Sequence, residues 1–199
     1  MGYAISWLAV KGKSEEVLIA ELGLAPTGEM AEYGDSMFTG RKLPSGWLLL
    51  VINESEHKLV RPNSLAALSQ GCEVIASSIE EHVMVCSSEL WRDGAQVWRI
   101  EHDAQKNIEH IAASGDLPAE YPAIKQEHAE EQKQAGGSEA HVDYFFEIPL
   151  HTAKNIVGFK HDEVDPAIED ESFMVFELDA VRSGERIENQ DKKPWWKLW

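Results

Sequence analysis

Two runs of alternating side chains around Arg92-Asp93-Gly94 constrain the fold more than any other feature of the sequence. Residues 83–91 and 95–102 alternate apolar with polar side chains, which is typical of strands that are buried on one side. Asp-Gly between two such runs is a strong signal for a β-hairpin. We therefore expect an antiparallel sheet at the centre of the fold.

Two registers of this hairpin are possible, and only one separates apolar from charged side chains. A two-residue loop would pair Glu89 with Trp98 and mix both kinds of side chain on each face. A three-residue loop, with Gly94 in the left-handed conformation, pairs Trp91 with Ala95. One face then holds Met84, Cys86, Ser88, Leu90, Trp98, Ile100 and His102. Because a slip of one residue would destroy this separation, we predict the three-residue loop.

The first 80 residues alternate between predicted strands and predicted helices. Apolar runs predict strands at residues 3–10, 35–43, 46–53 and 72–79. One helix is expected between Ser14, a good N-cap, and Gly23, and a second between Pro62 and Gly71. The order strand, helix, strand, strand, helix, strand is that of a split β-α-β, ferredoxin-like sheet with both helices on one face.

Helical patterns predominate beyond residue 102. Asp103 is expected to cap the first of three helices, and Pro149 to begin the last. The three predicted helices lie at residues 103–115, 118–135 and 149–158. A late apolar run at residues 173–178 predicts one more strand.

The expected fold class is therefore α+β, with an antiparallel sheet of about six strands flanked by helices and a helical C-terminal portion. We expect a single domain over residues 1–180. Its sheet would lie in residues 1–102 and its mainly helical part in residues 103–180. Residues 181–199 have the composition of a flexible tether that ends in a basic aromatic tail.

The chain is strongly acidic, with 18 Lys and Arg against 35 Asp and Glu and a formal net charge of -17. Nucleic acids and anionic membrane surfaces attract basic proteins, so neither is an expected partner. An acidic surface instead favours fast association with a basic protein. We therefore expect the partner to be a basic protein or a second subunit.

No part of the sequence predicts export or a membrane span. Residues 1–7 lack a basic segment followed by a long apolar one, and no run approaches the ~20 apolar residues of a spanning helix. Cys72 and Cys86 are too few for a disulfide framework and lie in predicted strands, where a thiol is usually a small buried apolar group. We therefore expect a cytoplasmic, reduced protein.

Glu80, His82 and His102 form the first candidate site. In the predicted register Glu80, His82 and Met84 share a face, and His102 lies opposite Met84 on the next strand. Two imidazoles and a carboxylate could hold a divalent metal ion or act as an acid–base pair. The simpler interpretation places His82 in a loop and His102 at the end of a hairpin. Because no second ligand cluster supports a metal, we expect no cofactor.

The C-terminal tail and the acidic runs are candidate partner surfaces. Trp195, Trp196 and Trp199 lie among lysines, a combination that suits insertion into a groove on a partner or a second subunit. The tail could instead pack on its own domain. Contact with lipid headgroups ranks last because one short charged segment anchors weakly. Acidic side chains that could neutralise a basic partner, or simply face solvent, include Glu130, Glu131 and Asp170.

The expected function is that of a non-enzymatic, bacterial-type interaction protein that binds a basic protein. An immunity or antitoxin role is one concrete version. This prediction depends on the acidity, the aromatic tail, and a sequence without a nucleophile elbow or a Gly-rich phosphate loop. The alternative is a small metal-assisted hydrolase that uses His82, His102 and Glu80.

Overall fold

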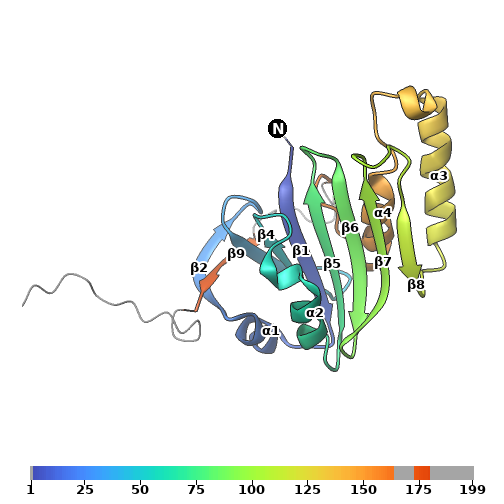
Figure 1. Ribbon diagram of the computed structural model, residues 1–199. Coiled ribbons are helices and arrows are strands. Elements are labelled where there is room, and N and C mark those ends of the chain that lie inside the picture. The colour runs from blue at the N-terminus through green and yellow to red at the C-terminus, as the bar shows by residue number, and fades with distance from the viewer. Residues whose placement is uncertain (1, 164–172, 180–199) are drawn as a thin grey trace, which may run out of the picture.

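A computed structural model describes residues 2–163 and 173–179, in which nine strands form one antiparallel sheet (Figure 1). The strands are β1 (Ala4–Lys11), β2 (Leu24–Ala31), β3 (Phe38–Lys42), β4 (Leu48–Ile52), β5 (Glu73–Glu80), β6 (Val85–Arg92), β7 (Ala95–Asp103), β8 (Ala112–Gly115) and β9 (Phe173–Leu178). Their order across the sheet is β2-β9-β3-β4-β1-β5-β6-β7-β8. The late strand β9 is confirmed where it was predicted.

Four α-helices and two short 3-10 helices accompany the sheet within the described residues. They are α1 (Glu15–Leu22), α2 (Pro62–Leu68), α3 (Tyr121–Gln134), α4 (Glu147–Val157), η1 (Lys58–Val60) and η2 (Gly137–Glu139). The Ser14 side chain caps α1 by accepting a bond from the backbone N–H of Val17, and Gly23 ends this helix in the left-handed conformation. None of these helices is both long and apolar enough to cross a bilayer.

The prediction of about six strands in a ferredoxin-like arrangement is wrong, because the sheet has nine. The strands that were not predicted are β2 and β8, at the two edges of the sheet, and the predicted late strand β9 joins the same sheet between β2 and β3. Strand β2 is mostly exposed at one edge and β8 fully exposed at the other, so neither has an apolar pattern that sequence analysis can detect. Strands β8 and β9 also come from the part of the chain that was expected to be mainly helical.

The hairpin of β6 and β7 is present, but its predicted register is wrong. Arg92 pairs with Ala95, which leaves a two-residue turn at Asp93 and Gly94. Both turn residues have positive φ, 49° and 80°, as a type I′ turn requires. The register then shifts between Leu90 and the next residue along β6, so that the ladder continues with one extra residue in β7.

This β-bulge returns the apolar side chains of both strands to one face. Direct pairing now joins Cys86 with His102 and Leu90 with Trp98. The predicted apolar face is therefore retained although every pairing in it differs from the prediction. Met84 lies in the turn between β5 and β6 with a φ of 52°, and from there its side chain packs against the same core.

The helix predicted over residues 103–115 is also wrong. Strand β7 extends to Asp103, whose side chain accepts a bond from the backbone N–H of Gln105 (3.0 Å). Asn107 similarly accepts from the backbone N–H of Glu109 (2.8 Å). Such local side-chain bonds favour turns over helix. The chain therefore turns back and adds β8 beside β7.

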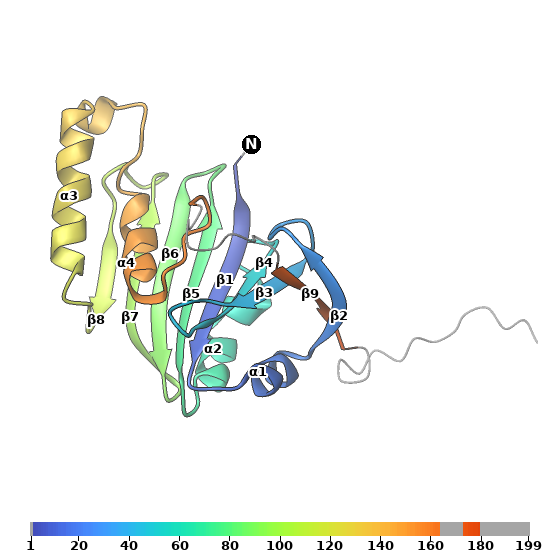
Figure 2. The same cartoon turned by 180° about the vertical axis from the view of Figure 1, so that it is seen from behind.

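Alternating side chains fill two separate cores on the two faces of the sheet. From β1, Ile5, Trp7 and Ala9 face one core, and Leu8 and Val10 face the other. Helices α3 and α4 complete the first core, and α1 and α2 complete the second (Figure 2). In Figure 1, no described helix covers the near face of β7 and β8 or the upper half of β6. This part of the sheet face is therefore left to the loops and to solvent.

Two neighbouring residues of β3 differ in how well they suit their surroundings: one fits a very close approach of the strands, and the other buries a hydroxyl group without a partner in the described part of the chain. A Cβ on Gly40 would lie 2.7 Å from the carbonyl oxygen of Leu49 in β4 and 3.1 Å from the ring of Phe176 in β9. A backbone oxygen cannot move aside, so this close approach of the strands requires glycine. Thr39 is fully buried, and its hydroxyl has no hydrogen-bond partner among the described residues.

Substitutions at these two positions should change stability in opposite directions. Gly40→Ala is expected to lower the free energy of unfolding by about 2 kcal/mol, because the added methyl group overlaps the β4 backbone. Thr39→Val should raise it by about 1 kcal/mol, because it removes an unsatisfied buried hydroxyl. Urea unfolding followed by tryptophan fluorescence measures both values. A stabilised Gly40→Ala variant or a destabilised Thr39→Val variant would contradict the packing described for β3.

Candidate functional site

The residues predicted as a metal or acid–base site do not converge. Glu80 pairs with Val85, and Val85 pairs with Asp103, so these three side chains share one face of the sheet. His102 precedes Asp103 and therefore points to the opposite face. His82 lies in the turn after β5, where its Nδ1 is 2.7 Å from Glu80 Oε1. The structure thus brings His82 and Glu80 together and separates both from His102.

His102 is fully buried on the α4 side of the sheet. Its Nδ1 lies 2.8 Å from the carbonyl oxygen of His110, and its Nε2 lies 2.9 Å from Asp143 Oδ2. Because both ring nitrogens face acceptors of the protein itself, neither is available to a metal ion. Across residues 2–163 and 173–179, no group of three or more His, Cys, Asp or Glu side chains is placed to hold a metal.

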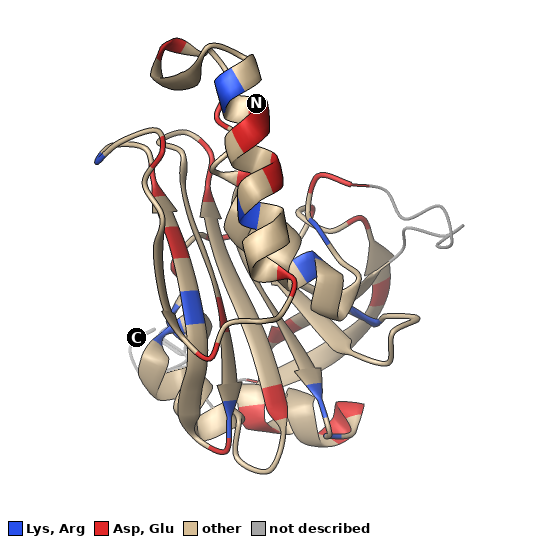
Figure 3. Cartoon of the chain, turned by 90° about the vertical axis from the view of Figure 1, so that its right-hand side faces the viewer, with Lys and Arg blue, Asp and Glu red and all other residues tan. Residues whose placement is uncertain are grey.

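The predicted partner surfaces are only partly described. Glu130 and Glu131 lie on α3, where Glu130 is exposed and Glu131 contacts His128. Figure 3 shows acidic positions on α3, on the strands and in the loops, with basic positions interspersed among them. Four predicted residues lie outside the described part of the chain: Asp170, Trp195, Trp196 and Trp199.

The open part of the sheet, on the face opposite α4, forms a polar groove of two adjoining hollows. Their volumes are about 460 and 450 Å³, and both are lined by Glu56, Ser78, Ser87 and Arg99. The first hollow adds Glu80, Glu101 and Asp103, so four carboxylates face one guanidinium. The second hollow adds Arg61, Glu89 and Gln96. One end of this groove is therefore acidic, and the other has balanced charges.

Neighbouring groups keep the carboxylates at the acidic end ionised. The hydrogen bond with His82 lowers the pKa of Glu80. Burial alone would raise the pKa of Glu101, but hydrogen bonds from Arg99 and Lys106 lower it below its usual range. Both carboxylates are therefore negative at neutral pH. The first hollow presents this charge to any group that enters it.

Glu89 fixes the other end of the groove. Its side chain is almost fully buried and accepts bonds from Trp91 Nε1 (2.8 Å), Gln96 Nε2 (2.5 Å) and Arg99 Nη1 (3.0 Å). Arg99 also donates to Glu101 (3.1 Å) and thus lies between two carboxylates. The protein therefore satisfies Glu89 internally, and the excess negative charge of the groove comes from the four carboxylates of the first hollow.

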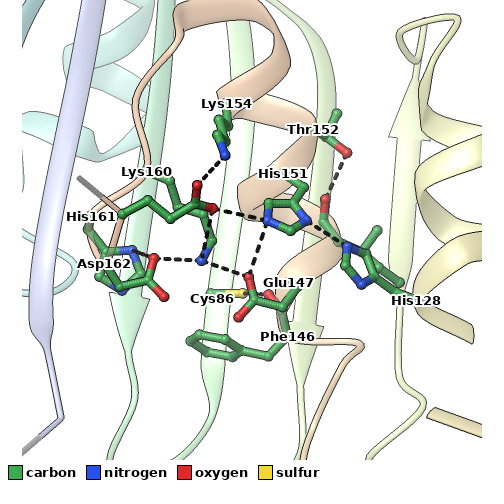
Figure 4. Close-up of polar contacts among 12 residues, drawn as sticks. Cys86, His128, Phe146, Glu147, His151, Thr152, Lys154, Lys160, His161 and Asp162 are labelled. Atoms are coloured by element: carbon green, nitrogen blue, oxygen red, sulfur yellow. Dashed lines mark hydrogen bonds and ion pairs between the residues drawn. The ribbon is translucent and has the colours of Figure 1, made fainter. Parts of the chain in front are cut away.

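A second group of polar residues lies on the opposite face, beside α4 (Figure 4). At its centre is Lys160, which is 6% exposed. Its Nζ lies 2.9 Å from Glu147 Oε2 and 2.5 Å from Asp162 Oδ1. Burial alone would lower the pKa of Lys160, but these hydrogen bonds raise it. The ammonium group therefore ties α4 to the segment that follows it.

Two imidazoles extend this group to α3. His128 Nε2 of α3 lies 2.7 Å from His151 Nδ1 of α4. His128 Nδ1 contacts Glu131 (2.8 Å), and His151 Nε2 contacts Glu163 (3.3 Å). Sequence analysis assigned no role to His128 or His151, and it named Glu131 only as an acidic side chain that could face a partner or solvent. The spacings His128 to Glu131 and Glu147 to His151, three and four residues, place each pair on one helix face and were the available signal.

Cys86 lies beneath α4 and is held as a neutral thiol. Burial raises its pKa well above the usual range, and the nearby carboxylates of Glu147 and Asp143 add to the shift. Its Sγ donates a hydrogen bond to the carbonyl oxygen of Phe146 (3.1 Å). A protonated, fully buried thiol is a poor nucleophile, so this cysteine serves packing.

Comparison with known protein families, with curated proteins and with solved structures found no match to this chain. The assignment of a function therefore depends on geometry. Lys160 is itself buried and paired with carboxylates of the protein, whereas the groove on the other face encloses space that a ligand could enter. The groove is therefore the candidate binding surface.

The buried ammonium of Lys160 should contribute strongly to stability. Lys160→Met is expected to lower the free energy of unfolding by about 3 kcal/mol at neutral pH, because it leaves Glu147 and Asp162 without their buried partner. The pKa of Asp162 is lowered by Lys160 although burial opposes the shift. The stabilisation is therefore present above the usual carboxyl range and lost as the pH falls through the folded-state pKa.

Lys154→Met is the matched control for this measurement. Lys154 contacts Glu163 from a position that is about one-third exposed, so its loss should cost less than about 1 kcal/mol. Urea unfolding of both variants at neutral pH and at about pH 3 tests the comparison. Equal stability losses in the two variants would show that the Lys160 contacts are not the stabilising ones.

Proposed function

We propose that this protein is a non-enzymatic interaction protein whose open, acidic sheet face binds a basic protein partner. The observation that supports this most directly is the groove over β5, β6 and β7, where four carboxylates and one guanidinium line the first hollow. Lysine or arginine side chains of a partner would meet ionised acceptors there. The net charge of -17 would also speed association with such a partner.

The shape of the groove supports a protein partner more than a small molecule. Both hollows are partly open to solvent, and serine and charged side chains make up much of their lining. Small-molecule sites are usually enclosed and mostly apolar. Protein–protein interfaces, in contrast, have polar and charged rims that remain accessible to solvent. Electrostatic complementarity between the two partners contributes to their specificity.

The more specific parts of this proposal extend beyond the groove. An immunity or antitoxin role in the cytoplasm would use the same acidic surface to neutralise a basic toxin. Glu130 on α3 and the aromatic tail with Trp195 would add contacts. The alternative of a metal-assisted hydrolase gains no support, because Glu80 and His102 lie on opposite faces of the sheet.

Neutralising the acidic end of the groove should weaken binding of a basic ligand. A fluorescently labelled oligo-arginine peptide is a suitable probe, with fluorescence anisotropy at low and at raised salt as the readout. Replacing both Glu80 and Glu101 by Gln is expected to weaken binding by about tenfold, because two close carboxylates are lost. Raised salt should reduce the difference.

The double substitution of Glu15 and Glu16 by Gln on α1 is the control. It removes the same charge from an exposed helix on the covered part of the sheet, and it should weaken binding less than about twofold. An equal loss in both double variants would indicate a nonspecific charge effect. No binding of oligo-arginine by the unmodified protein at low salt would refute the proposal.

The C-terminal tail should not be needed for binding of this probe. The residues that line the groove all belong to the described part of the chain, so a protein that ends at residue 191 should bind oligo-arginine as the full chain does. Anisotropy titration of the two forms makes the comparison. If truncation abolished binding, the tail and not the groove would be the binding element.

A further inference from the structure

Helix α3 is held on the body of the protein by an unusually polar contact. Its buried side chains are Tyr121, Ile124, His128 and Gln132, and two of these four are polar. Gln132 bonds the segment that follows α3, through the carbonyl oxygens of Gly137 and Val142. His128 is therefore the polar side chain that links α3 to α4, through its 2.7 Å contact with His151.

The two imidazoles belong to a chain of three hydrogen bonds that runs from Glu131 through His128 and His151 to Glu163. Each bond needs one proton, and the two carboxylates act as acceptors. Two neutral imidazoles supply only two protons. Three protons on the four ring nitrogens satisfy the whole chain, so its best-bonded state has a single positive charge between two carboxylates.

A fourth proton breaks this arrangement. Both imidazoles would then be cations, and an N–H of His128 would point at an N–H of His151 across 2.7 Å. Two like charges at this separation repel, so the contact does not hold in the doubly protonated state. The rings must move apart to accept the last proton. Since one ring lies on α3 and the other on α4, the hydrogen bond that joins the two helices is then lost.

Charged groups from every packed element face this pair. Glu131 faces His128 from α3, and Glu147 faces His151 from α4. The segment after α4 provides Glu163 and Lys160, and Lys154 of α4 neutralises Glu163. From the sheet beneath, the neutral thiol of Cys86 lies beside Glu147.

We propose that the His128–His151 pair is an acid-sensitive latch, which holds α3 on α4 near neutral pH and releases it below about pH 6. This inference is independent of the groove, which lies on the other face of the sheet.

Burial lowers the pKa of His151, and the nearby His128 and Lys160 add to this effect, although Glu147 and Glu163 oppose it. A histidine whose pKa is lowered in the docked state takes up a further proton when it is released. The stability of docking is therefore full above the usual histidine range and is lost as the pH falls through the docked-state pKa. The hydrogen bond from Lys154 lowers the pKa of Glu163, so this carboxylate remains ionised in the same range.

Hydrogen exchange of the intact protein tests the latch. After correction for the intrinsic exchange rate, amides of α3 should lose protection by about tenfold between about pH 7.5 and about pH 5, because release binds about one more proton. Amides of β5 and β6 should remain protected. In His151→Gln, the neutral amide can still bond His128, so protection of α3 should become nearly independent of pH.

His82→Gln is the matched control, because His82 is an exposed histidine that also contacts a glutamate. This variant should retain the pH dependence of the unmodified protein. Unchanged α3 protection between the two pH values, or a tenfold loss that persists in His151→Gln, would overturn the proposal. If His151→Gln does not fold, NMR titration of the ring nitrogens of His128 and His151 in the unmodified protein replaces this test. Titration of the two rings in two separated steps would support the latch, and simultaneous titration would refute it.

Discussion

The four described helices cover only part of the two faces of the sheet, because the sheet extends beyond them. The rest of the structure depends on which part they cover. Helices α1 and α2 lie on one face, and α3 and α4 lie on the other, displaced towards β6 and β7. Strand β4, covered on both sides, is buried at all five positions. Strand β7 is covered on one side only, and Arg99 and Glu101 face the uncovered side. The polar groove is thus a direct result of the displacement of the helices.

Much of the local structure could be predicted from the sequence, because it depends on local chemistry. Ser14 and Gly23 mark the ends of α1 through capping and a left-handed residue, and Gly158 ends α4 in the same way. The hairpin was found from Asp93-Gly94, but its register depends on a bulge that no local signal reveals. Strands β2 and β8 were missed, because edge strands formed by exposed or small residues lack an apolar pattern.

The candidate sites were harder to predict than the fold, because they join residues that are distant in sequence. Glu80 was identified as a site residue and does line the groove, but Arg99 and Glu101 were not recognised as its neighbours. The assignment of His102 to the same site depended on a register in error, and a strand places successive residues on opposite faces. The contact of His128 with His151 requires α3 to fold back on α4, which periodicity alone does not predict.

The position of β9 has a consequence for the order in which the chain folds. Among the described residues, strand β2 is paired with β9 alone, and β9 separates it from β3, although 141 residues lie between β2 and β9 in sequence. On the ribosome, the central strands can find their partners while translation continues, whereas β2 must wait for nearly the whole chain to emerge. Such a distant pairing is slow to form. Until β9 arrives, the outer edge of β3 remains open to intermolecular pairing, so chaperones would have most to protect at this stage of biosynthesis.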